Sequence, residues 1–398
     1  MRKFFEKIIE SIFTVSGAAT SIAILLIVVF LFKEGAGFFR HSEVENGYVL
    51  CVNAKNPVCS LTSNEIKQVF DYQIDNWQNL GGNDENIAPF RINDISSYFS
   101  DEELGENYEH LAEKLGEIIS HTSGIIAFIP AQYAPENNPD VKILPDKKLN
   151  PAEFFGGKEW LPTATPAPQF GILPLLLGTL WVGLFAIIIA LPLGLGVAIY
   201  LSELASPRTR NLLKPAIELL AGIPSVVYGF FGLVVLVPFV QKAFNLPVGE
   251  TAFAGSIILA IMALPTIITV AEDSMRSTPQ AMREASLGLG GNHWQTIYRV
   301  IIPYSISGIS AAVVLGIGRA IGETMAVLMV TGNAAVIPHT LFEPVRTIPA
   351  TIAAELGEAP TDGAHYGALF MLGCILFIIT VLVSITAEAV SKKRANFS

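Results

Sequence analysis

The stretch Gly171–Ser202 reads GILPLLLGTLWVGLFAIIIALPLGLGVAIYLS and contains no Asp, Glu, Lys or Arg. About 20 apolar residues are enough for a helix to cross the hydrocarbon core of a bilayer. A helix is the expected form, because an isolated strand would leave backbone polar groups without hydrogen bonds in lipid. This stretch therefore predicts a membrane-spanning helix.

Five other runs in the chain have the same apolar character. They are Ser11–Phe32, Leu219–Gln241, Thr251–Ala271, Tyr304–Gly332 and Tyr366–Ala387. Charged residues make up only 15% of the chain, whereas about a quarter of an ordinary soluble protein is charged. We therefore predict an all-α membrane protein with six transmembrane helices. The first run is too long for the apolar part of a signal peptide and lacks a following cleavage site, so we expect an uncleaved anchor.

The distribution of Lys and Arg predicts the orientation of these helices. Basic residues gather before the first run, in every second loop and after the sixth run. They are Arg2, Lys3, Lys7, Arg208, Arg210, Lys214, Arg276, Arg283, Arg299, Lys392, Lys393 and Arg394. Short loops that carry such an excess stay on the cytoplasmic side. Both termini are therefore predicted to be cytoplasmic, and the segment between the first two runs to be extracytoplasmic.

That extracytoplasmic segment is acidic and has the pattern of a folded domain. Residues 43–159 hold 20 acidic residues against 8 Lys and Arg, a net charge of −12 that leaves about +2 for the rest. A helix is predicted from Ser63 to Phe70 with Ser63 as its cap, and a strand over residues 124–129. We predict a small α/β insert over residues 41–160, between an N-terminal transmembrane helix (1–40) and a membrane core (161–398).

Two cysteines of the insert, Cys51 and Cys59, allow a disulfide if the insert faces an oxidising compartment. Two free thiols are the alternative, and the spacing does not decide between them. The absence of a basic patch argues against nucleic acid as a partner.

The loop between the fourth and fifth runs predicts two short helices. Thr278 is expected to cap the first helix, with Pro279 at its first position. That helix should end at the glycines Gly288, Gly290 and Gly291, and a second helix should lead to Pro303, which is expected to open the fifth span.

This loop resembles the coupling loop of binding-protein-dependent ABC permeases, written Glu-Ala-Ala, three residues, Gly, nine residues, Ile-x-Leu-Pro. The chain has Glu284-Ala285-Ser286, then Gly290, then Val300-Ile301-Ile302-Pro303, at the same spacing. The resemblance implies that the loop, residues 272–300, sits on a separate ATPase; an ordinary amphipathic connector is the alternative. The chain contains no Gly-x-x-x-x-Gly-Lys-[Ser/Thr] phosphate loop. ATP and Mg are therefore assigned to that partner, and we expect no catalytic residue, cofactor or metal in this chain.

The fifth run carries the charges Arg319 and Glu323, four residues apart and predicted to share one helical face. A charge at membrane depth costs several kcal/mol, so it normally faces a partner or a watery path. Arg319 could meet an oxyanion on a translocation path, with Glu323 balancing part of its charge. The two could instead form an ion pair that locks the helix to a neighbour. Small residues at spacing four (Gly308, Ala312, Gly316 and Ala320) should let another helix approach closely.

Residues 318–327, GRAIGETMAV, resemble the signature of the C subunit of bacterial Pst phosphate permeases, and residues 217–229 resemble its third span. The likeness covers about residues 174–390. It implies the type I ABC importer permease fold, with Arg319, Glu323 and Thr324 on the phosphate pathway. The implied partners are a second Pst-type permease, an ATP-binding subunit dimer and an extracytoplasmic phosphate-binding protein. The implied location is the bacterial cytoplasmic (inner) membrane.

The insert is partly similar to periplasmic phosphate-binding proteins. The matching residues are Leu61-Thr62, Ile66, Phe70, Ile74, Asn76-Trp77, Leu80-Gly81-Gly82, Thr122–Phe128 and Tyr133. The anion-binding Ser-Gly-Thr stretch of those proteins is not found. We therefore expect the insert to dock or gate a binding protein rather than to capture phosphate. Two functional alternatives stay open: a permease for another oxyanion, and a membrane-anchored phosphate sensor that does not transport.

Overall fold

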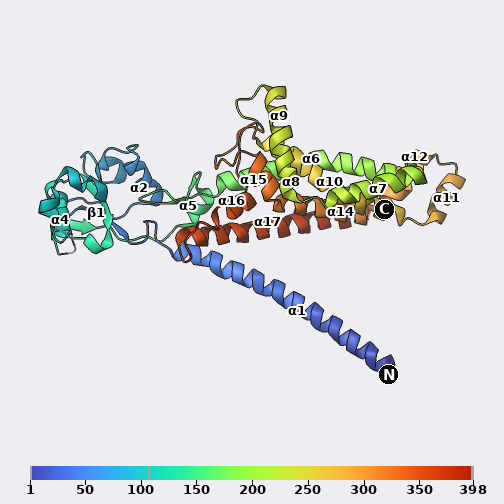
Figure 1. The fold of residues 1–398 in the computed structure, drawn as a ribbon, viewed down its shortest axis with the longest axis horizontal. Coiled ribbons are helices and arrows are strands. Elements are labelled where there is room, and N and C mark those ends of the chain that lie inside the picture. The colour runs from blue at the N-terminus through green and yellow to red at the C-terminus, as the bar shows by residue number, and fades with distance from the viewer. Residues whose placement is uncertain (1, 106–107, 136, 396–398) are drawn as a thin grey trace. The chain divides into compact units, whose positions relative to one another are not determined.

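The computed structural model describes residues 2–105, 108–135 and 137–395, and it forms two compact units (Figure 1). The membrane unit comprises residues 1–35, 173–358 and 369–398, and the insert unit comprises residues 36–172 and 359–368. The basic side chains of Arg2, Lys3, Lys392, Lys393 and Arg394, named above for the orientation, lie outside the described side chains.

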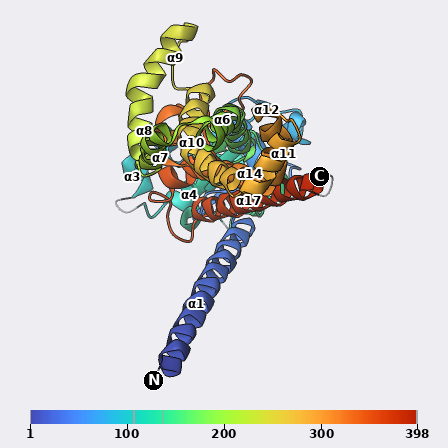
Figure 2. The same cartoon turned by 90° about the vertical axis from the view of Figure 1, so that its right-hand side faces the viewer.

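The centre of the membrane unit is built from three helices, α6 (Leu173–Ile199), α10 (Ala252–Arg276) and α14 (Ile306–Gly322), which Figure 2 shows gathered together. The small residues at spacing four in α14 let another helix approach closely, as predicted, and that helix is α10. A side chain at Gly308 would overlap Ser274, and one at Gly316 would come within 2.7 Å of Ile267. Because α10 is apolar on most of its surface and largely buried, it is the helix on which the others assemble.

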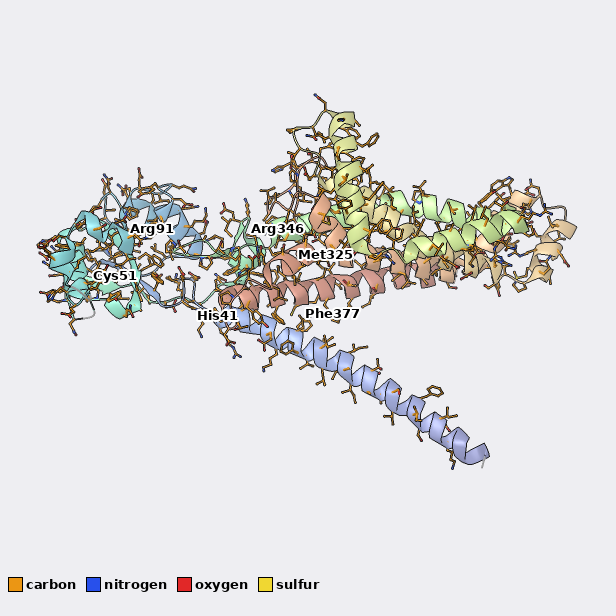
Figure 3. The ribbon with its side chains drawn as sticks, in the orientation of Figure 1. His41, Cys51, Arg91, Met325, Arg346 and Phe377 are labelled. Atoms are coloured by element: carbon orange, nitrogen blue, oxygen red, sulfur yellow. The ribbon has the colours of Figure 1, made fainter. Side chains whose placement is uncertain are left out.

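Two further long helices lie largely in the membrane unit, α1 (Arg2–Gly37) and α17 (Ala364–Ala395). The C-terminal half of α1 packs on α17 through edge-to-face aromatic pairs, Phe30 with Phe370 and Phe32 with Phe377, the last of which Figure 3 labels. Within the described residues, five helices are long and apolar enough to span a membrane. A bent pair, His293–Tyr304 with Ile306–Gly322, makes a sixth if it counts as one span. The described residues thus hold five candidate spans, or six with the bent pair, and the predicted all-α membrane fold is confirmed.

The third span begins later than predicted. Leu219 belongs to a separate helix, α7 (Pro207–Ala221), and the chain breaks before α8 (Ser225–Phe231). Pro224 explains the break, because it lacks a backbone N–H and disfavours helical geometry at the preceding residue. A π-helical turn (Gly232–Leu236) and α9 (Val237–Phe244) complete this span.

The fifth span is also divided, and the predicted common face of Arg319 and Glu323 is wrong. Helix α14 ends at Gly322, and Glu323 has an extended backbone (φ −71°, ψ 134°). The Glu323 carboxylate accepts a hydrogen bond from the N–H of Ala326 at 3.3 Å, which helps to start α15 (Met325–Val330). A long loop then leads to α16 (Ile348–Glu355).

The start of the fifth span is corrected as well. Pro303 lies in a short helix, α13 (Ile302–Tyr304), and does not open the span, which begins at Ile306 after a bend of 71°. Ser305 holds this bend: its hydroxyl donates to the Ser274 carbonyl at 3.1 Å, and the Ser274 hydroxyl donates to the Ser305 carbonyl at 3.2 Å.

The insert is a small α/β unit, as predicted. A four-stranded sheet has the order β2-β3-β1-β4, in which β2 and β3 are parallel and the other pairs antiparallel. The strands are β1 (Tyr48–Asn53), β2 (Ala88–Arg91), β3 (Ile125–Pro130) and β4 (Val141–Ile143). The helices are α2 (Ser63–Phe70), α3 (Asp101–Leu104), α4 (Leu111–His121) and α5 (Pro151–Gly156), and a two-stranded ribbon joins β5 (Trp160–Leu161) to β6 (Gln169–Phe170). Thr62, not Ser63, caps α2, through a reciprocal pair with Glu65.

The possible disulfide between Cys51 and Cys59 is not formed, and both thiols are free. Successive side chains of a strand point to opposite faces of the sheet. Cys51 (labelled in Figure 3) is buried in the core on the α4 face of the sheet, whereas Val58, next to Cys59, packs into the core on the α2 face. The sheet therefore separates the two cysteines.

Candidate functional site

The loop after α10 forms a protruding helix with a defined end. Helix α11 (Gln280–Gly288) has Pro279 at its N-cap position and no side-chain cap. The Thr278 hydroxyl, predicted to cap this helix, lies 3.3 Å from that of Ser305 instead. The chain then turns at Gly290, whose φ of +85° favours glycine. Asn292 caps the following helix, α12 (His293–Thr296), through a capping box with Gln295. A π-helical turn over Ile297–Ile301 joins α12 to α13.

The α11 surface is available to a partner. None of its residues is buried, and Glu284 and Ala285 are both exposed. Ser286 instead binds the loop together, since its hydroxyl lies 2.9 Å from that of Thr296. Exposed apolar side chains surround this point: Met282, Leu287, Leu289 and Trp294. A groove of about 520 Å³ runs between α11 and the Ile297–Ile301 turn.

An ion pair anchors α11 to α6. The Arg283 guanidinium pairs with the Glu203 carboxylate, in the π-helical turn (Tyr200–Leu204) that continues α6, and it donates to the Met275 carbonyl at 2.9 Å. The Glu203 side chain is only 3% exposed. His293 adds a contact of 3.2 Å to the Glu203 carbonyl oxygen. These contacts tie α11 directly to the ends of α6 and α10.

A second charge cluster fixes α7 to α10. Arg210 donates to one oxygen of Glu272 at 2.9 and 2.7 Å, and Lys214 donates to the other oxygen at 2.6 Å. Lys214 also contacts Asp273, and Arg276 lies 3.8 Å from Glu272. Because Glu272 is 1% exposed and α7 buries none of its own residues, this carboxylate is the main attachment of α7 within the described chain.

The predicted pathway residues occupy three different settings. Arg319 lies half-buried in the last turn of α14, within electrostatic range of Tyr228 on α8. No ion pair joins it to Glu323 or to any other carboxylate of the described residues. The locking ion pair with Glu323 is therefore not formed. Glu323 instead accepts a hydrogen bond from the N–H of Ala326, in the first turn of α15.

Thr324 lines a cavity of about 490 Å³ between the α14–α15 break, α16 and α17. The other lining residues are mostly apolar: Pro349, Ile352, Ala353, Leu356 and Leu376, with Gly322 and Gly357. Neither Arg319 nor Glu323 lines this cavity. The structure thus brings Glu284, Ala285, Ser286 and Gly290 together in the loop, but it does not unite Arg319, Glu323 and Thr324 around one space.

A family model described as "Binding-protein-dependent transport system inner membrane component" matches residues 190–396, more than half of the chain. The chain belongs to this family of transport-system membrane components. The matched residues include α10, α11 and α14, the elements that carry the exposed loop and Arg319. A second model, described as a PBP superfamily domain, matches residues 30–179, which contain the insert.

Named relatives of this membrane component are transport permeases. The probable ABC transporter permease protein YqgH of Bacillus subtilis is 39% identical over 246 residues, 62% of this chain and 79% of that protein. The phosphate transport system permease protein PstC of Mesorhizobium japonicum is 41% identical over 249 residues, 58% of this chain and 75% of that protein. A solved structure of the MetNI methionine ABC transporter has a TM-score of 0.44 and 16% identity, covering 56% of this chain and 96% of that chain.

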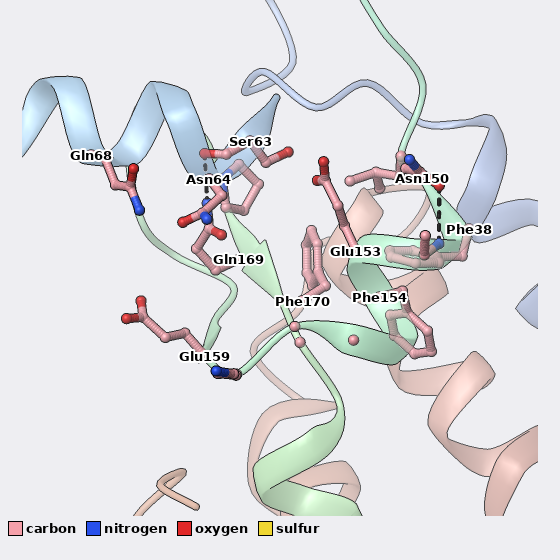
Figure 4. A pocket seen from close by; sticks show the side chains of 17 residues that line it. Phe38, Ser63, Asn64, Gln68, Asn150, Glu153, Phe154, Glu159, Gln169 and Phe170 are labelled. Atoms are coloured by element: carbon pink, nitrogen blue, oxygen red, sulfur yellow. Dashed lines mark hydrogen bonds between the residues drawn. The ribbon is translucent and has the colours of Figure 1, made fainter. Parts of the chain in front are cut away.

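The insert of this membrane component contains a cavity of about 520 Å³, into which Glu153 and Phe170 project (Figure 4). Its charged lining residues are Glu153, Glu159 and Lys158. Burial raises the pKa of Glu153, assisted by the nearby carboxylate of Glu65. Arg91 does not reach this cavity, because its guanidinium stacks over Phe70 and donates to Thr165. An acidic lining of this kind does not suit a divalent anion.

Sequence reasoning missed four residues that hold this region together. Glu203 anchors α11, Glu272 anchors α7, and Ser274 and Ser305 hold the bend before α14. A signal for the two acids was present. Each lies within a few residues of the end of a long apolar run and faces a loop rich in Lys and Arg. Ser274 and Ser305 carry no such signal, because serine is common in membrane helices. Their contact also depends on the bend before α14, which the sequence does not reveal.

Proposed function

We propose that this chain is the membrane permease subunit of an ATP-driven importer of inorganic phosphate. The family match over residues 190–396, together with a relative named as a phosphate transport permease at 41% identity, carries this proposal. The chain would form half of the pathway, and a second Pst-type permease would form the other half. It would act in the bacterial inner membrane as a transporter, with no catalytic residue, cofactor or metal of its own.

The proposed orientation follows from the basic loops. The ends of α6 and α10, with α7 and α11, would face the cytoplasm together with both termini, and residues 41–160 would lie outside. A dimer of ATP-binding subunits, which would hold ATP and Mg, would receive α11 and the exposed residues Glu284 and Ala285. This assignment is supported by the protrusion of α11 and its apolar surroundings.

The coupling that we propose uses the contacts at the base of α11. Closure of the ATPase dimer would move α11, and the partly buried Arg283–Glu203 pair would pass this movement to α6. The Ser274–Ser305 pair would pass it to the bend that precedes α14. The Arg283–Glu203 pair joins α11 to the end of α6, and the serine pair joins α10 to the start of α14, so a displacement of the loop would alter the packing of these three helices.

Arg319 would offer the transported anion a transient site. It has no carboxylate partner among the described residues, so its charge is available. A guanidinium presents a fork of donors that matches an oxyanion. Release requires that this binding stays weak. The neighbouring Glu323 carboxylate, engaged with Ala326, and Thr324 would set the local field at the break.

The insert would dock or gate an external phosphate-binding protein rather than capture phosphate. Its match to a PBP superfamily domain and its acidic cavity support this role. Calorimetric titration of the full-length chain with phosphate would test it, using Arg319→Gln to remove the membrane site. Micromolar binding that is lost on changing insert residues would contradict a docking role.

The proposed function is tested by uptake of labelled phosphate into proteoliposomes that contain the complete assembly. We expect ATP-dependent uptake that excess unlabelled phosphate abolishes and that sulfate or molybdate leaves in place. Competition by sulfate or molybdate at equal concentration would assign another oxyanion as substrate. ATP hydrolysis that responds to phosphate without any uptake would assign a sensor and would refute transport.

A further inference from the structure

A basic cavity lies where α6, α7, α10 and α11 meet, outside the proposed pathway. It has a volume of about 440 Å³, within the range of small-molecule sites. Its charged lining residues are Arg210, Arg276 and Arg283, and the amides Asn211 and Gln280 add neutral donors. No Asp or Glu is among the residues that line it.

The carboxylates of this region are buried beneath the arginine side chains that bind them. Glu272 and Glu203 are 1% and 3% exposed, and each is covered by the guanidinium that binds it. Counted by formal charge, the cluster holds Arg210, Lys214, Arg276 and Arg283 against Glu203, Glu272 and Asp273, an excess of one positive charge. The face that the cavity presents is therefore cationic, although most of the charge behind it is neutralised.

Arg276 is the cation of this cluster that has no hydrogen-bonded carboxylate partner among the described residues. Its guanidinium makes no hydrogen bond in the described part of the chain, and its nearest carboxylate oxygen, on Glu272, is 3.8 Å away. Its side chain is 45% exposed. By contrast, Arg210 and Arg283 already donate to carboxylates. An arginine fork with free donors is well matched to phosphate oxygens, which it can bind through two parallel hydrogen bonds.

We propose that this cavity binds a phosphate group, with Arg276 as its principal ligand and Arg210 and Arg283 as flanking charges. Two sources share this chemistry: the phosphodiester of an anionic phospholipid and free inorganic phosphate. Basic pockets between membrane helices on the cytoplasmic side are typical binding sites of anionic headgroups. Because Arg283 belongs to α11, an anion held here bridges the loop helix to α7 and α10. Only the cytoplasmic placement rests on the proposed function; the site itself does not.

The test is native mass spectrometry of the purified full-length chain, released from nanodiscs of phosphatidylcholine with or without phosphatidylglycerol. Arg276→Gln removes the free guanidinium. Arg208→Gln is the matched control, since Arg208 is exposed at the start of α7, next to the lining residue Pro207, and does not itself line the cavity. We expect phosphatidylglycerol to be retained by the wild type and the control, and retention to fall about tenfold in Arg276→Gln. Arg276→Lys, which keeps the charge but loses the fork, should be intermediate.

A second arm identifies the source of the phosphate. Calorimetry in neutral detergent, in an Arg319→Gln background, measures binding of inorganic phosphate without the proposed transport site. Phosphate binding that weakens about tenfold with Arg276→Gln supports free phosphate as the ligand, and selective lipid retention alone supports the headgroup. The proposal is overturned if neither ligand binds, or if Arg208→Gln and Arg276→Gln reduce binding equally. Failure of transport would leave both arms unaffected, so the two proposals are judged separately.

Discussion

Replacing Glu272 by Gln should release helix α7 from α10. Glu272 is 1% exposed and binds Arg210 and Lys214 at 2.6–2.9 Å, while α7 buries none of its own residues. The amide keeps the size of the side chain and one acceptor oxygen, but it removes the charge that compensates two cations. Those cations are about a quarter exposed, so water relieves part of the cost.

The expected size of the effect follows from this arrangement. Breaking a buried ion pair by removing one partner costs about 3–5 kcal/mol. The retained oxygen and the partial exposure of the two cations lower this cost. We therefore expect the attachment of α7 to α10 to weaken by about 2–3 kcal/mol, within the range for lost hydrogen bonds to charged groups. At 1.4 kcal/mol for each factor of ten, the opening equilibrium of α7 should rise about 30- to 150-fold.

Amide hydrogen exchange measures that opening directly. Peptides covering residues 207–221 should exchange about 30- to 150-fold faster in Glu272→Gln, whereas peptides from residues 252–268 of α10 should change little. Asp273→Asn is the control, because Asp273 binds the same Lys214 but is 60% exposed. An exposed pair contributes about 0–1 kcal/mol, at most about fivefold in exchange. Unchanged exchange of α7 in Glu272→Gln, or equal effects of the two variants, would refute the reasoning.

Three further predictions concern the insert and the loop. Burial raises the pKa of Cys51 to about 12, so a maleimide at neutral pH should label Cys59 and leave Cys51 unmodified; comparable labelling, or Cys59 labelling only after reduction, would contradict the structure. Gly290→Ala should destabilise the α11 end by about 1 kcal/mol, since φ is +85° there, and hydrogen exchange of α11 should rise while Gly288→Ala changes little. Burial, with a nearby carboxylate, raises the pKa of Glu43 from 4.5 to about 7. The folded insert therefore keeps a proton that the unfolded chain loses, and its melting temperature should fall as pH rises from about 4.5 to 7 and then level off. Glu43→Gln should flatten this profile, and an unchanged profile would show that Glu43 is not responsible.

The transmembrane helices could be predicted from sequence because lipid imposes a simple rule of length and polarity. Thr251–Ala271 lies almost entirely within α10 and Gly171–Ser202 largely matches α6, since nothing within either run competes with a continuous helix. Even Pro192 leaves α6 intact. The rule failed where the backbone changes direction within an apolar run. Pro224 interrupts the predicted third run, and the extended backbone at Glu323 divides the fifth.

The local turns of the loop could be predicted from the sequence, but the geometry around Arg319 could not. The glycines marked the end of α11, because turn chemistry is local. The predicted pairing of Arg319 with Glu323 assumed one unbroken helix, and that assumption was wrong. Glu203 and Glu272 were not found, because their roles depend on contacts with Arg283 and Arg210, about 60 to 80 residues away.

The central claim is that Arg319 meets the transported anion, and initial uptake of labelled phosphate by Arg319→Gln tests it most directly. The complete assembly in proteoliposomes is compared with Lys242→Gln, which removes an exposed cation at the end of α9. Loss of a charged hydrogen-bond donor to the anion predicts a reduction of at least about tenfold, with normal assembly by size-exclusion chromatography. Uptake equal to that of Lys242→Gln would contradict the account.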